Sequence, residues 1–499
     1  MPRDEIINLA LRRGLFYRTA EIYANAPAGF WDFGPTGETV RRKIIDFWRN
    51  EFVEAEGMVE IYGSQILPKE VFVASGHLEN FNDPVVKCKK CNSVFRVDYL
   101  LKEYAEIEIP ETLPLDEYEK LIAEYKIACP NCLGSFGKPF LFNLMMKVAI
   151  GASKPKECYL RPETCQTIFL NFARLYKIMR KNLPFGIAQA GCSFRNEISP
   201  RNVLLREREL GQMEAEIFFN PEKINDVERW EDVENYELNL FLLKDKRIHK
   251  ITCQEAVESR LVSGKIIAYY LARVQQLYEK YGLKNEKLRF RELSKEERPF
   301  YAIETWDFEV ETEDFGFVEL AACNYRSDYD LRRHAKFSKK DLKVKEDGKE
   351  FYPHVFEISI GLDRTFYVLI DNAFRKELRG KEERIYLDLN PKIAPYLAGI
   401  FPLVKKDSLD EIAQNIYREL LSYRFDVLYD AKGSIGKRYA RIDEIGVPYA
   451  ITVDYQTKED NTVTLRERNS MQQKRVKIKK LPEILWHLKL GKITFDKIK

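Results

Sequence analysis

Charged residues are grouped around one predicted hairpin, where they could hold a nucleotide. Residues 191–198 read Gly-Cys-Ser-Phe-Arg-Asn-Glu-Ile, and a basic turn follows at Ser199–Asn202. The order of residue types predicts strand, loop and strand, with Arg195, Glu197 and Arg206 around the turn. Because guanidinium groups donate paired hydrogen bonds to phosphates, we expect a site that binds a nucleoside triphosphate without a P-loop.

Polar residues alternate with apolar ones on two further predicted strands. Since side chains alternate between the faces of a strand, each strand gathers its polar residues on one face: Gln212, Glu214 and Glu216 on the first, Glu357, Ser359 and Gly361 on the second. A half-solvated sheet shows the same alternation, so either strand alone leaves both interpretations open. Glu163 adds an acid after the extended residue that precedes Pro162. Converging carboxylates repel one another unless they meet a cation, and an ammonium group is the natural guest.

Arginines elsewhere in the chain could supply the opposite charge. They are Arg195, Arg206, Arg326 and Arg364. Their planar guanidinium groups suit phosphates and carboxylates. Together, the acids and arginines predict a ligand that carries an amine and also phosphate or carboxylate groups.

Four of the nine cysteines form two C-x-x-C pairs, Cys88 with Cys91 and Cys129 with Cys132. Four thiolates in two tight pairs suit tetrahedral Zn²⁺, and a closed set of four leaves no open position for catalysis. Redox or incidental pairs are the alternative. An acid-rich stretch with helical character, Glu103–Glu124, separates the pairs. We predict a structural zinc site.

The composition is that of an ordinary globular protein, with 45% hydrophobic and 32% charged residues. A length of 499 residues predicts two or three domains. The net charge of +3 means that a polyanion must bind a local basic patch, and residues 466–499 offer one unless they are simply a solvated surface. Scattered cysteines, with no signal peptide and no membrane-length apolar run, predict reduced thiols, no membrane association and a cytoplasmic location.

Periodicity and prolines divide the rest of the chain. Helical spacing over Asp226–Lys246 and Glu255–Tyr281 predicts a helical insertion at about 223–300. Alternation at Trp306–Glu311 then returns the chain to sheet. Two prolines within Leu389–Pro395 mark a boundary. Beyond it strands and helices alternate, which predicts a small α/β domain.

Several of these segments resemble one known family. Phe194–Glu197 together with Arg206 and Leu210 resembles motif 2 of the class II aminoacyl-tRNA synthetases, and Gly361–Arg364 resembles their motif 3. Further segments narrow the resemblance, over nearly the whole chain, to the dimeric glycyl-tRNA synthetases of the archaeal and eukaryotic type. These segments are Trp31–Pro35, Ser75–Phe81, Tyr159–Thr164 and Ile435–Arg441.

The resemblance implies a multidomain α/β fold. A class II catalytic domain, built as an antiparallel sheet with flanking helices, would span residues 1–84 and 141–388. A four-cysteine zinc-binding insertion would span 85–140, and residues 392–499 would form an α/β anticodon-binding domain. The region Gly34–Phe52, which is similar to motif 1, would form a homodimer interface.

The resemblance also implies ligands and site residues. The catalytic pair would be Arg195, on the α-phosphate and carboxylate, and Arg364, on the γ-phosphate. The full ATP-binding set would be Arg195, Asn196, Glu197, Arg206, Leu210, Glu319, Leu320, Gly361 and Arg364. The glycine-binding set would be Arg96, Glu163, Gln212, Glu214, Arg326, Glu357 and Ser359. With Mg²⁺ on the phosphates no general base is required, because positioning and charge neutralisation catalyse this type of displacement. The partner would be tRNA(Gly).

The chain departs from the family pattern near the expected substrate. Leu210 stands where phenylalanine usually stacks on adenine. The other departures are Cys165 and Thr167 for alanine and glycine, Ala322 for glycine, Asn324 and Tyr325 for alanine and aspartate, and Ile358 for proline. Two alternatives therefore stay open: a non-catalytic tRNA-binding paralogue, and a class II synthetase for another small amino acid.

One glycine-containing loop near the C-terminus could be mistaken for a P-loop. In Gly433–Arg438 the glycine spacing is short, and Arg438 stands where serine or threonine would bind Mg²⁺. With the basic C-terminal segment, this loop would instead suit tRNA phosphates.

Overall fold

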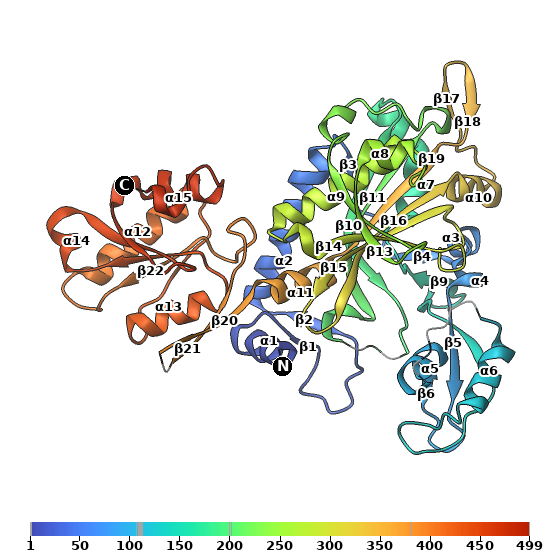
Figure 1. The fold of residues 1–499 in the computed structure, drawn as a ribbon, viewed down its shortest axis with the longest axis horizontal. Helices are drawn as coiled ribbons and strands as arrows, with labels where there is room; N and C mark the ends of the chain where they lie inside the picture. Colours follow the sequence, from blue (N-terminus) through green and yellow to red (C-terminus); the bar gives the residue numbers. More distant parts are fainter. Residues whose placement is uncertain are drawn as a thin grey trace.

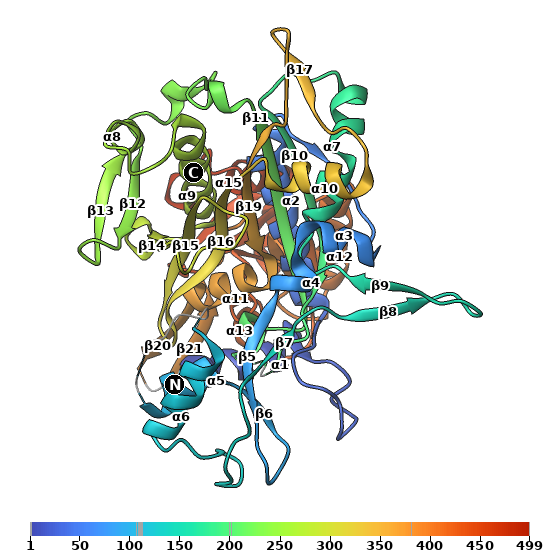
Figure 2. The same cartoon turned by 90° about the vertical axis from the view of Figure 1, so that its right-hand side faces the viewer.

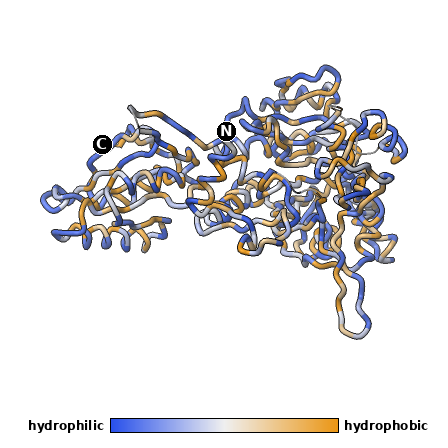
Figure 3. The backbone as a smooth tube through the Cα atoms, turned by 90° about the horizontal axis from the view of Figure 1, so that it is seen from below, coloured by the Kyte–Doolittle hydropathy of each residue, from blue (hydrophilic) through white to orange (hydrophobic). Residues whose placement is uncertain are grey.

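The molecule has a large lobe, a C-terminal lobe and a small cysteine-containing insertion, which Figure 1 shows at the right, left and lower right. The computed structural model describes residues 2–105, 107, 113–198, 200, 202–380 and 382–498. Within that part of the chain, no helix is both long and apolar enough to cross a membrane. Apolar and polar residues are interspersed along both lobes (Figure 3).

A nine-stranded sheet forms the centre of the large lobe. Neighbouring strands run antiparallel, apart from β12 with β14 and β10 with β3, which are parallel. In spatial order the strands are β13 (Arg247–Thr252), β12 (Glu237–Leu242), β14 (Leu288–Glu292), β15 (Glu304–Thr312), β16 (Gly316–Ser327), β19 (His354–Gly361), β11 (Glu209–Phe219), β10 (Phe185–Phe194) and β3 (Val59–Glu60). The predicted antiparallel sheet is confirmed.

Helices pack against the apolar face of this sheet. The main core joins Met213, Ala215 and Ile217 of β11 to four helices. These helices are α1 (Pro2–Arg13), α2 (Pro35–Trp48), α9 (Lys265–Tyr281) and α11 (Leu362–Ala373). A second core lies on the opposite face of β11, which also carries Gln212, Glu214 and Glu216. It packs α7 (Gln166–Met179) and α10 (Tyr329–Ser338) around Phe218. The alternate residues of β11 are thereby turned to the other face, as the period of two predicts.

The predicted helical insertion is wrong in its first half. α8 (Cys253–Glu258) and α9 account for the second helical stretch, but Asp226–Lys246 contains β12 and only a short 3-10 turn. Strands β12, β13 and β14 extend the main sheet instead. The side chains of Leu238, Leu240 and Leu242 are all buried, which is the period of a strand. Apolar residues just before them imitate helical spacing.

The cysteine-containing insertion is a small sheet with two helices. Its strands and helices are β5 (Asn82–Lys87), β6 (Val94–Arg96), β7 (Phe140–Asn143), α5 (Val97–Ala105) and α6 (Leu115–Glu124). The helices bear out both ends of the predicted acid-rich helical stretch, while residues 106 and 108–112 lie outside the described part of the chain. Nearby, β8 (Lys147–Ile150) and β9 (Lys156–Leu160) form a hairpin that projects from the lobe in Figure 2 and pairs with β4 (Ile66–Pro68).

The C-terminal lobe has the predicted alternation of strands and helices. Its sheet has the order β23, β22, β24, β25, β26, in which β22 runs parallel to β23 and to β24. The strands are β22 (Ala398–Pro402), β23 (Val427–Tyr429), β24 (Tyr449–Val453), β25 (Thr462–Glu467) and β26 (Gln473–Lys477). The helices are α12 (Leu409–Ser422), α13 (Ile435–Asp443), α14 (Tyr455–Asp460) and α15 (Leu481–Lys489).

Shorter elements complete the described chain. They are β1 (Phe16–Arg18), β2 (Trp31–Phe33), α3 (Lys69–Ser75), α4 (His77–Asn80), β17 (Val344–Glu346), β18 (Lys349–Phe351), β20 (Phe374–Arg379) and β21 (Glu382–Leu387). The β20–β21 hairpin lies between the two lobes in Figure 1.

Candidate active site

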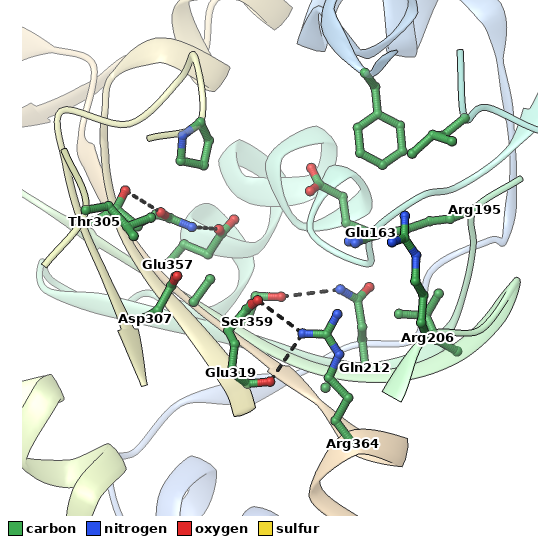
Figure 4. A pocket seen from close by; sticks show the side chains of 18 of the residues that line it. Glu163, Arg195, Arg206, Gln212, Thr305, Asp307, Glu319, Glu357, Ser359 and Arg364 are labelled. Atoms are coloured by element: carbon green, nitrogen blue, oxygen red, sulfur yellow. Dashed lines mark hydrogen bonds and ion pairs between the residues drawn. The ribbon is translucent and has the colours of Figure 1, made fainter. Parts of the chain in front are cut away.

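A cavity of about 910 Å³ lies on the polar face of the nine-stranded sheet. It is walled by β11, β15, β16 and β19, by α4 and α11, and by the segment from Arg291 at the end of β14 to Tyr301. Figure 4 shows acidic side chains from β15, β16 and β19, and arginines from the β10–β11 connection and from α11, around one space. The predicted site residues in its lining are Glu163, Arg195, Glu197, Arg206, Leu210, Gln212, Glu319, Leu320, Glu357, Ser359, Gly361 and Arg364.

The register of the strands explains why these residues converge. Side chains at directly paired positions lie side by side on one face. One row across the sheet is Thr305, Asn324, Glu357 and Glu216. The next row is Asp307, Ala322, Ser359 and Glu214. The two rows bring carboxylates from β15, β19 and β11 to the same side of the sheet.

Glu163 is a buried carboxylate with several donors around it. His77 Nε2 lies 3.1 Å from its Oε1, and Gln166 and Cys165 donate to the same oxygen at 3.1 and 3.0 Å. Burial acts to raise the pKa of Glu163, but His77 and then Arg326 outweigh burial and hold this pKa well below its ordinary value. Glu163 is therefore ionised. His77, from the segment Ser75–Phe81, lines the cavity and is therefore part of the site.

Glu357 has a donor on each oxygen. Asn324 Nδ2 donates to Oε1 at 2.6 Å, and Arg326 donates to Oε2. Burial is the main cause that raises the pKa of Glu357 to about 8. Arg326 lowers this pKa in part, and the neighbouring carboxylates Glu163 and Glu214 raise it further. Burial and Glu163 also raise the pKa of Glu214. The cavity wall thus holds more acid than its arginine neutralises.

Four predicted site residues are not in the cavity lining: Arg96, Asn196, Glu214 and Arg326. Arg326 is fully buried, pairs with both oxygens of Asp330 at 2.7 and 2.9 Å, and lies under the ring of Tyr301. Glu214 lies behind Ser359, whose hydroxyl donates to it at 2.7 Å.

The other two residues are held by their own neighbours. Arg96 Nη1 donates to Asp83 at 2.9 Å, and its Nε donates to Asp98 at 3.0 Å. Asp83 itself lines the cavity, so Arg96 lies one residue away from it. The backbone N–H of Asn196 donates to the carbonyl of Leu144.

The arginines lie on the other side of the cavity. Arg195 Nε donates to the carbonyl of Pro162 at 3.1 Å, and Arg206 Nε donates to Glu197 at 2.7 Å. Arg364 donates to Glu319 Oε2 at 3.1 Å. Residues 199 and 201 of the predicted basic turn lie outside the described chain. The described guanidinium groups border one space, as a polyphosphate requires.

Some cavity residues were not found from the sequence. Glu207 and Asp307 line the cavity, and burial raises the pKa of each well above its ordinary value, helped by Asp363 and by Glu319 respectively. The alternation of polar and apolar residues at Trp306–Glu311 could have indicated that Asp307 lies on a polar face. No pattern in the sequence indicates Glu207, because it lies next to arginines in an irregular segment.

The four paired cysteines come together in the insertion. The Sγ atoms of Cys88 and Cys132 are 3.5 Å apart, those of Cys91 and Cys129 are 3.6 Å apart, and all four lie within 4.8 Å of one another. Backbone N–H groups of Cys91 and Lys90 lower the pKa of Cys88. This geometry and chemistry fit a tetrahedral metal ion.

A second cluster of potential ligands lies behind the cavity. Atoms of Cys165, Glu216 and Glu357 are also within 4.8 Å of one another. Arg326 already supplies a positive charge to Glu357, so this set is an acid cluster around an arginine.

Three arginines of the C-terminal lobe do not have the predicted contact with phosphates. Arg438, Arg466 and Arg468 are 3%, 4% and 3% exposed. Arg438 donates to the carbonyls of Pro402 and Leu403. The other two pair with Asp443 and Asp388. Their role is architectural, and the exposed bases that remain there include Lys437, Lys479 and Lys480.

Known proteins match this chain over nearly its full length. The family model described as "tRNA synthetase class II core domain (G, H, P, S and T)" matches residues 147–373, and the one described as "Anticodon binding domain" matches residues 398–487. The glycine–tRNA ligase of Pyrococcus horikoshii is 40% identical over 567 aligned residues, which cover 97% of this chain and 98% of that protein. The glycine–tRNA ligase of Thermococcus sibiricus is 38% identical, over 98% of this chain and 99% of its own. The glycine–tRNA ligase of Methanocaldococcus jannaschii is 37% identical over 97% of this chain and 98% of that protein. The chain therefore belongs to the glycine–tRNA ligase family of class II tRNA synthetases.

Proposed function

We propose that this chain is a glycine–tRNA ligase. It joins glycine to ATP to give glycyl-adenylate and pyrophosphate, and then transfers glycine to the 3′-terminal ribose of tRNA(Gly). The observation that carries the proposal is one cavity in which buried carboxylates, Glu163 and Glu357, face arginines, Arg195 and Arg364. Two substrates match this charge pattern: an amino acid, whose ammonium group meets the acids, and a nucleoside triphosphate, whose phosphates meet the arginines.

The acids of the cavity bind the glycine ammonium. Glu163 is ionised and Glu357 is held by two donors, so both present oriented oxygens. Ser359 and Gln212 form part of the wall, and Glu214 acts through Ser359. Arg326 and Arg96 lie outside the cavity lining. Each donates to an acid that lines the cavity, Arg326 to Glu357 and Arg96 to Asp83.

The arginines bind ATP. Arg195 holds the α-phosphate next to the glycine carboxylate, Arg364 holds the γ-phosphate, and Arg206 is oriented by Glu197. The remaining ATP contacts come from Asn196, Leu210, Glu319, Leu320 and Gly361. Glu319 and Asp307 offer the carboxylate oxygens that Mg²⁺ prefers, and Mg²⁺ supplies charge neutralisation at the phosphates. Catalysis then rests on alignment and charge.

Four further features complete the proposal. Cys88, Cys91, Cys129 and Cys132 hold a structural Zn²⁺. Residues 392–499 bind the anticodon of tRNA(Gly). The region Gly34–Phe52 contributes to a homodimer interface, and the enzyme works in the cytoplasm.

Neither alternative function is favoured. A non-catalytic paralogue has no need for the charged set that the cavity retains. A synthetase for another small amino acid has to fit a side chain beside Asn324 and Ala322, which already form part of the wall.

An amino-acid screen of ATP–pyrophosphate exchange tests the proposal. The zinc-loaded protein is incubated with each amino acid in turn, and exchange is expected with glycine far above all others. Folded protein that exchanges with none of them is a paralogue without the activity. Faster exchange with alanine, serine, threonine or proline than with glycine assigns a different substrate.

A further inference from the structure

Thr305, Asn324 and Glu357 form a hydrogen-bonded row across three adjacent strands. The register places Asn324 directly opposite both of the others. Thr305 Oγ1 donates to Asn324 Oδ1 at 2.7 Å, and Asn324 Nδ2 donates to Glu357 Oε1 at 2.6 Å. All three residues line the cavity, and their exposures are 2%, 1% and 2%. In Figure 4, Thr305 and Glu357 lie on the same side of the cavity.

The row fixes which end of the asparagine amide faces the acid. A carboxylate accepts hydrogen bonds only, so it needs the NH₂ end of the amide. The carbonyl end is then left to accept the Thr305 hydroxyl. Thr305 therefore favours the amide orientation that serves Glu357.

A neutral donor is well suited to this position. Glu357 already has one cationic neighbour, Arg326, whose charge is shared with Asp330. A second cation would neutralise Glu357 and weaken its attraction for an ammonium group. The amide holds one oxygen in place without adding positive charge, so that Glu357, once ionised, attracts the ammonium group of a ligand. Hydrogen bonds to the ionised form also favour that form.

The repulsion around Glu357 shows why it needs to be held. Glu163 and Glu214 lie close enough to raise its pKa, and Glu216 is paired with it in the strand register. Like charges favour movement of the carboxylate away from its neighbours. Donors on both oxygens, Asn324 on Oε1 and Arg326 on Oε2, oppose such movement.

We propose that Asn324 is a positioning residue of the glycine site. Its amide, oriented by Thr305, keeps Glu357 turned toward the ammonium group, and its side chain occupies wall space that a larger amino acid would need. This inference rests on the function proposed above and extends it to the selection of glycine.

Substitutions of Asn324 give the direct test. In Asn324→Ala, the KM for glycine in ATP–pyrophosphate exchange is expected to rise about 10- to 100-fold, as for the loss of a hydrogen bond to a charged group, with a smaller change in kcat. Since the lost bond favours ionised Glu357, the acid limb of kcat/KM should move to higher pH. The ratio of alanine to glycine activation should rise, because the shorter side chain leaves room.

Thr305 provides a matched pair in case Asn324→Ala does not fold. Thr305→Val keeps the shape but removes the hydroxyl, so it should reproduce the KM increase and the pH shift in weaker form. Thr305→Ser keeps the hydroxyl and should behave as the wild type.

The outcomes separate this inference from the proposed function. Wild-type protein without glycine-dependent exchange refutes the proposed function. Active wild type, with glycine KM and acid limb unchanged in Asn324→Ala or in Thr305→Val, refutes the positioning role alone. A fall in kcat without a pH shift also overturns it, because a purely structural defect has that signature.

Discussion

Buried charges are arranged differently in the two lobes. In the C-terminal lobe, Arg466 donates to both oxygens of Asp443 at 2.9 Å, and both side chains are buried. In the large lobe, both carboxylate oxygens of Glu216 lack a hydrogen-bond partner within the described chain. A buried ion pair with complete partners stabilises the fold, whereas a group of crowded buried acids beside a cavity, with pKa values raised by burial, is a mark of a ligand site.

Arg466→Leu should have the largest effect, and it should fall on stability. Removing Arg466 takes two charge-assisted hydrogen bonds from Asp443 and leaves Arg384, 2.9 Å away, as its remaining cationic partner; each lost bond to a charged group costs about 1.5–3 kcal/mol. Denaturant unfolding should show early loss of the C-terminal lobe. Charging of tRNA should fall with it, while glycine-dependent exchange, which uses the other lobe, is kept.

An exposed pair is the control for this change. Lys349 and Glu222 are each 68% exposed and lie 2.8 Å apart. Lys349→Leu should cost less than about 1 kcal/mol. Equal losses in the two variants would contradict the architectural role of Arg466.

Glu163→Gln should damage activity and also lower stability. The amide keeps the size of the side chain and removes the charge that faces the ammonium group. Loss of one such electrostatic contact lowers the rate by about 100- to 1,000-fold. We expect kcat/KM for glycine in exchange to fall by this factor. The unfolding midpoint at pH 7 should also fall, because a pKa below its ordinary value means that the folded protein stabilises ionised Glu163. A variant within a few-fold of wild type would exclude Glu163 from the site.

The local parts of this arrangement could be predicted from the sequence. The period of two assigned Glu214 and Glu357 to polar faces, and the motif arginines Arg195 and Arg364 line the cavity. Long-range pairing could not be predicted in the same way. The contact of Thr305 with Asn324 depends on the register between two strands, and the burial of Arg326 on the packing of its neighbours.

Burial also explains the errors in the basic segments. Arg438 and Arg466 read as surface charge, because a sequence shows their sign and not their partners. The sequence predicts helix where β12 lies, because the buried leucines of β12 follow other apolar residues at helical spacing. Pairing with a strand that is distant in the chain, β14, stabilises the strand conformation of β12, and local periodicity does not show this pairing.

Glu216→Gln should stabilise the protein in a way that depends on pH. Burial, with Glu357 next, raises the pKa of Glu216 well above its ordinary value. An acid with a raised folded-state pKa loses stability as pH rises from the unfolded pKa through the folded one. The amide removes this loss, so the variant should be more stable than wild type at pH 9, by about 1–3 kcal/mol.

The same comparison near pH 3 serves as the control, because a glutamate with an ordinary pKa of about 4.3 is then protonated in the unfolded chain as well as in the folded one, and the two proteins should unfold alike. Glycine-dependent exchange should survive, since Glu216 is outside the cavity lining. An unchanged stability difference at the two pH values would contradict the assignment.

Leu210→Phe should have the smallest effect, a gain in ATP binding. Leu210 lines the cavity at the position expected to stack on adenine. An aromatic pair adds about 0.5–1.5 kcal/mol beyond area burial, so the KM for ATP should fall a few-fold while the KM for glycine stays constant. An increase in the KM for ATP would show that adenine lies elsewhere.

Proton release on glycine binding tests the central claim most directly. Calorimetric titration of the protein with glycine, beside a non-hydrolysable ATP analogue, is performed at pH 7 in buffers of different ionisation enthalpy. With the pKa of Glu357 near 8 before binding, the arriving ammonium should displace close to one proton into the buffer. Binding without proton release, or with proton uptake, would contradict the view that Glu357 carries a proton until the glycine ammonium replaces it.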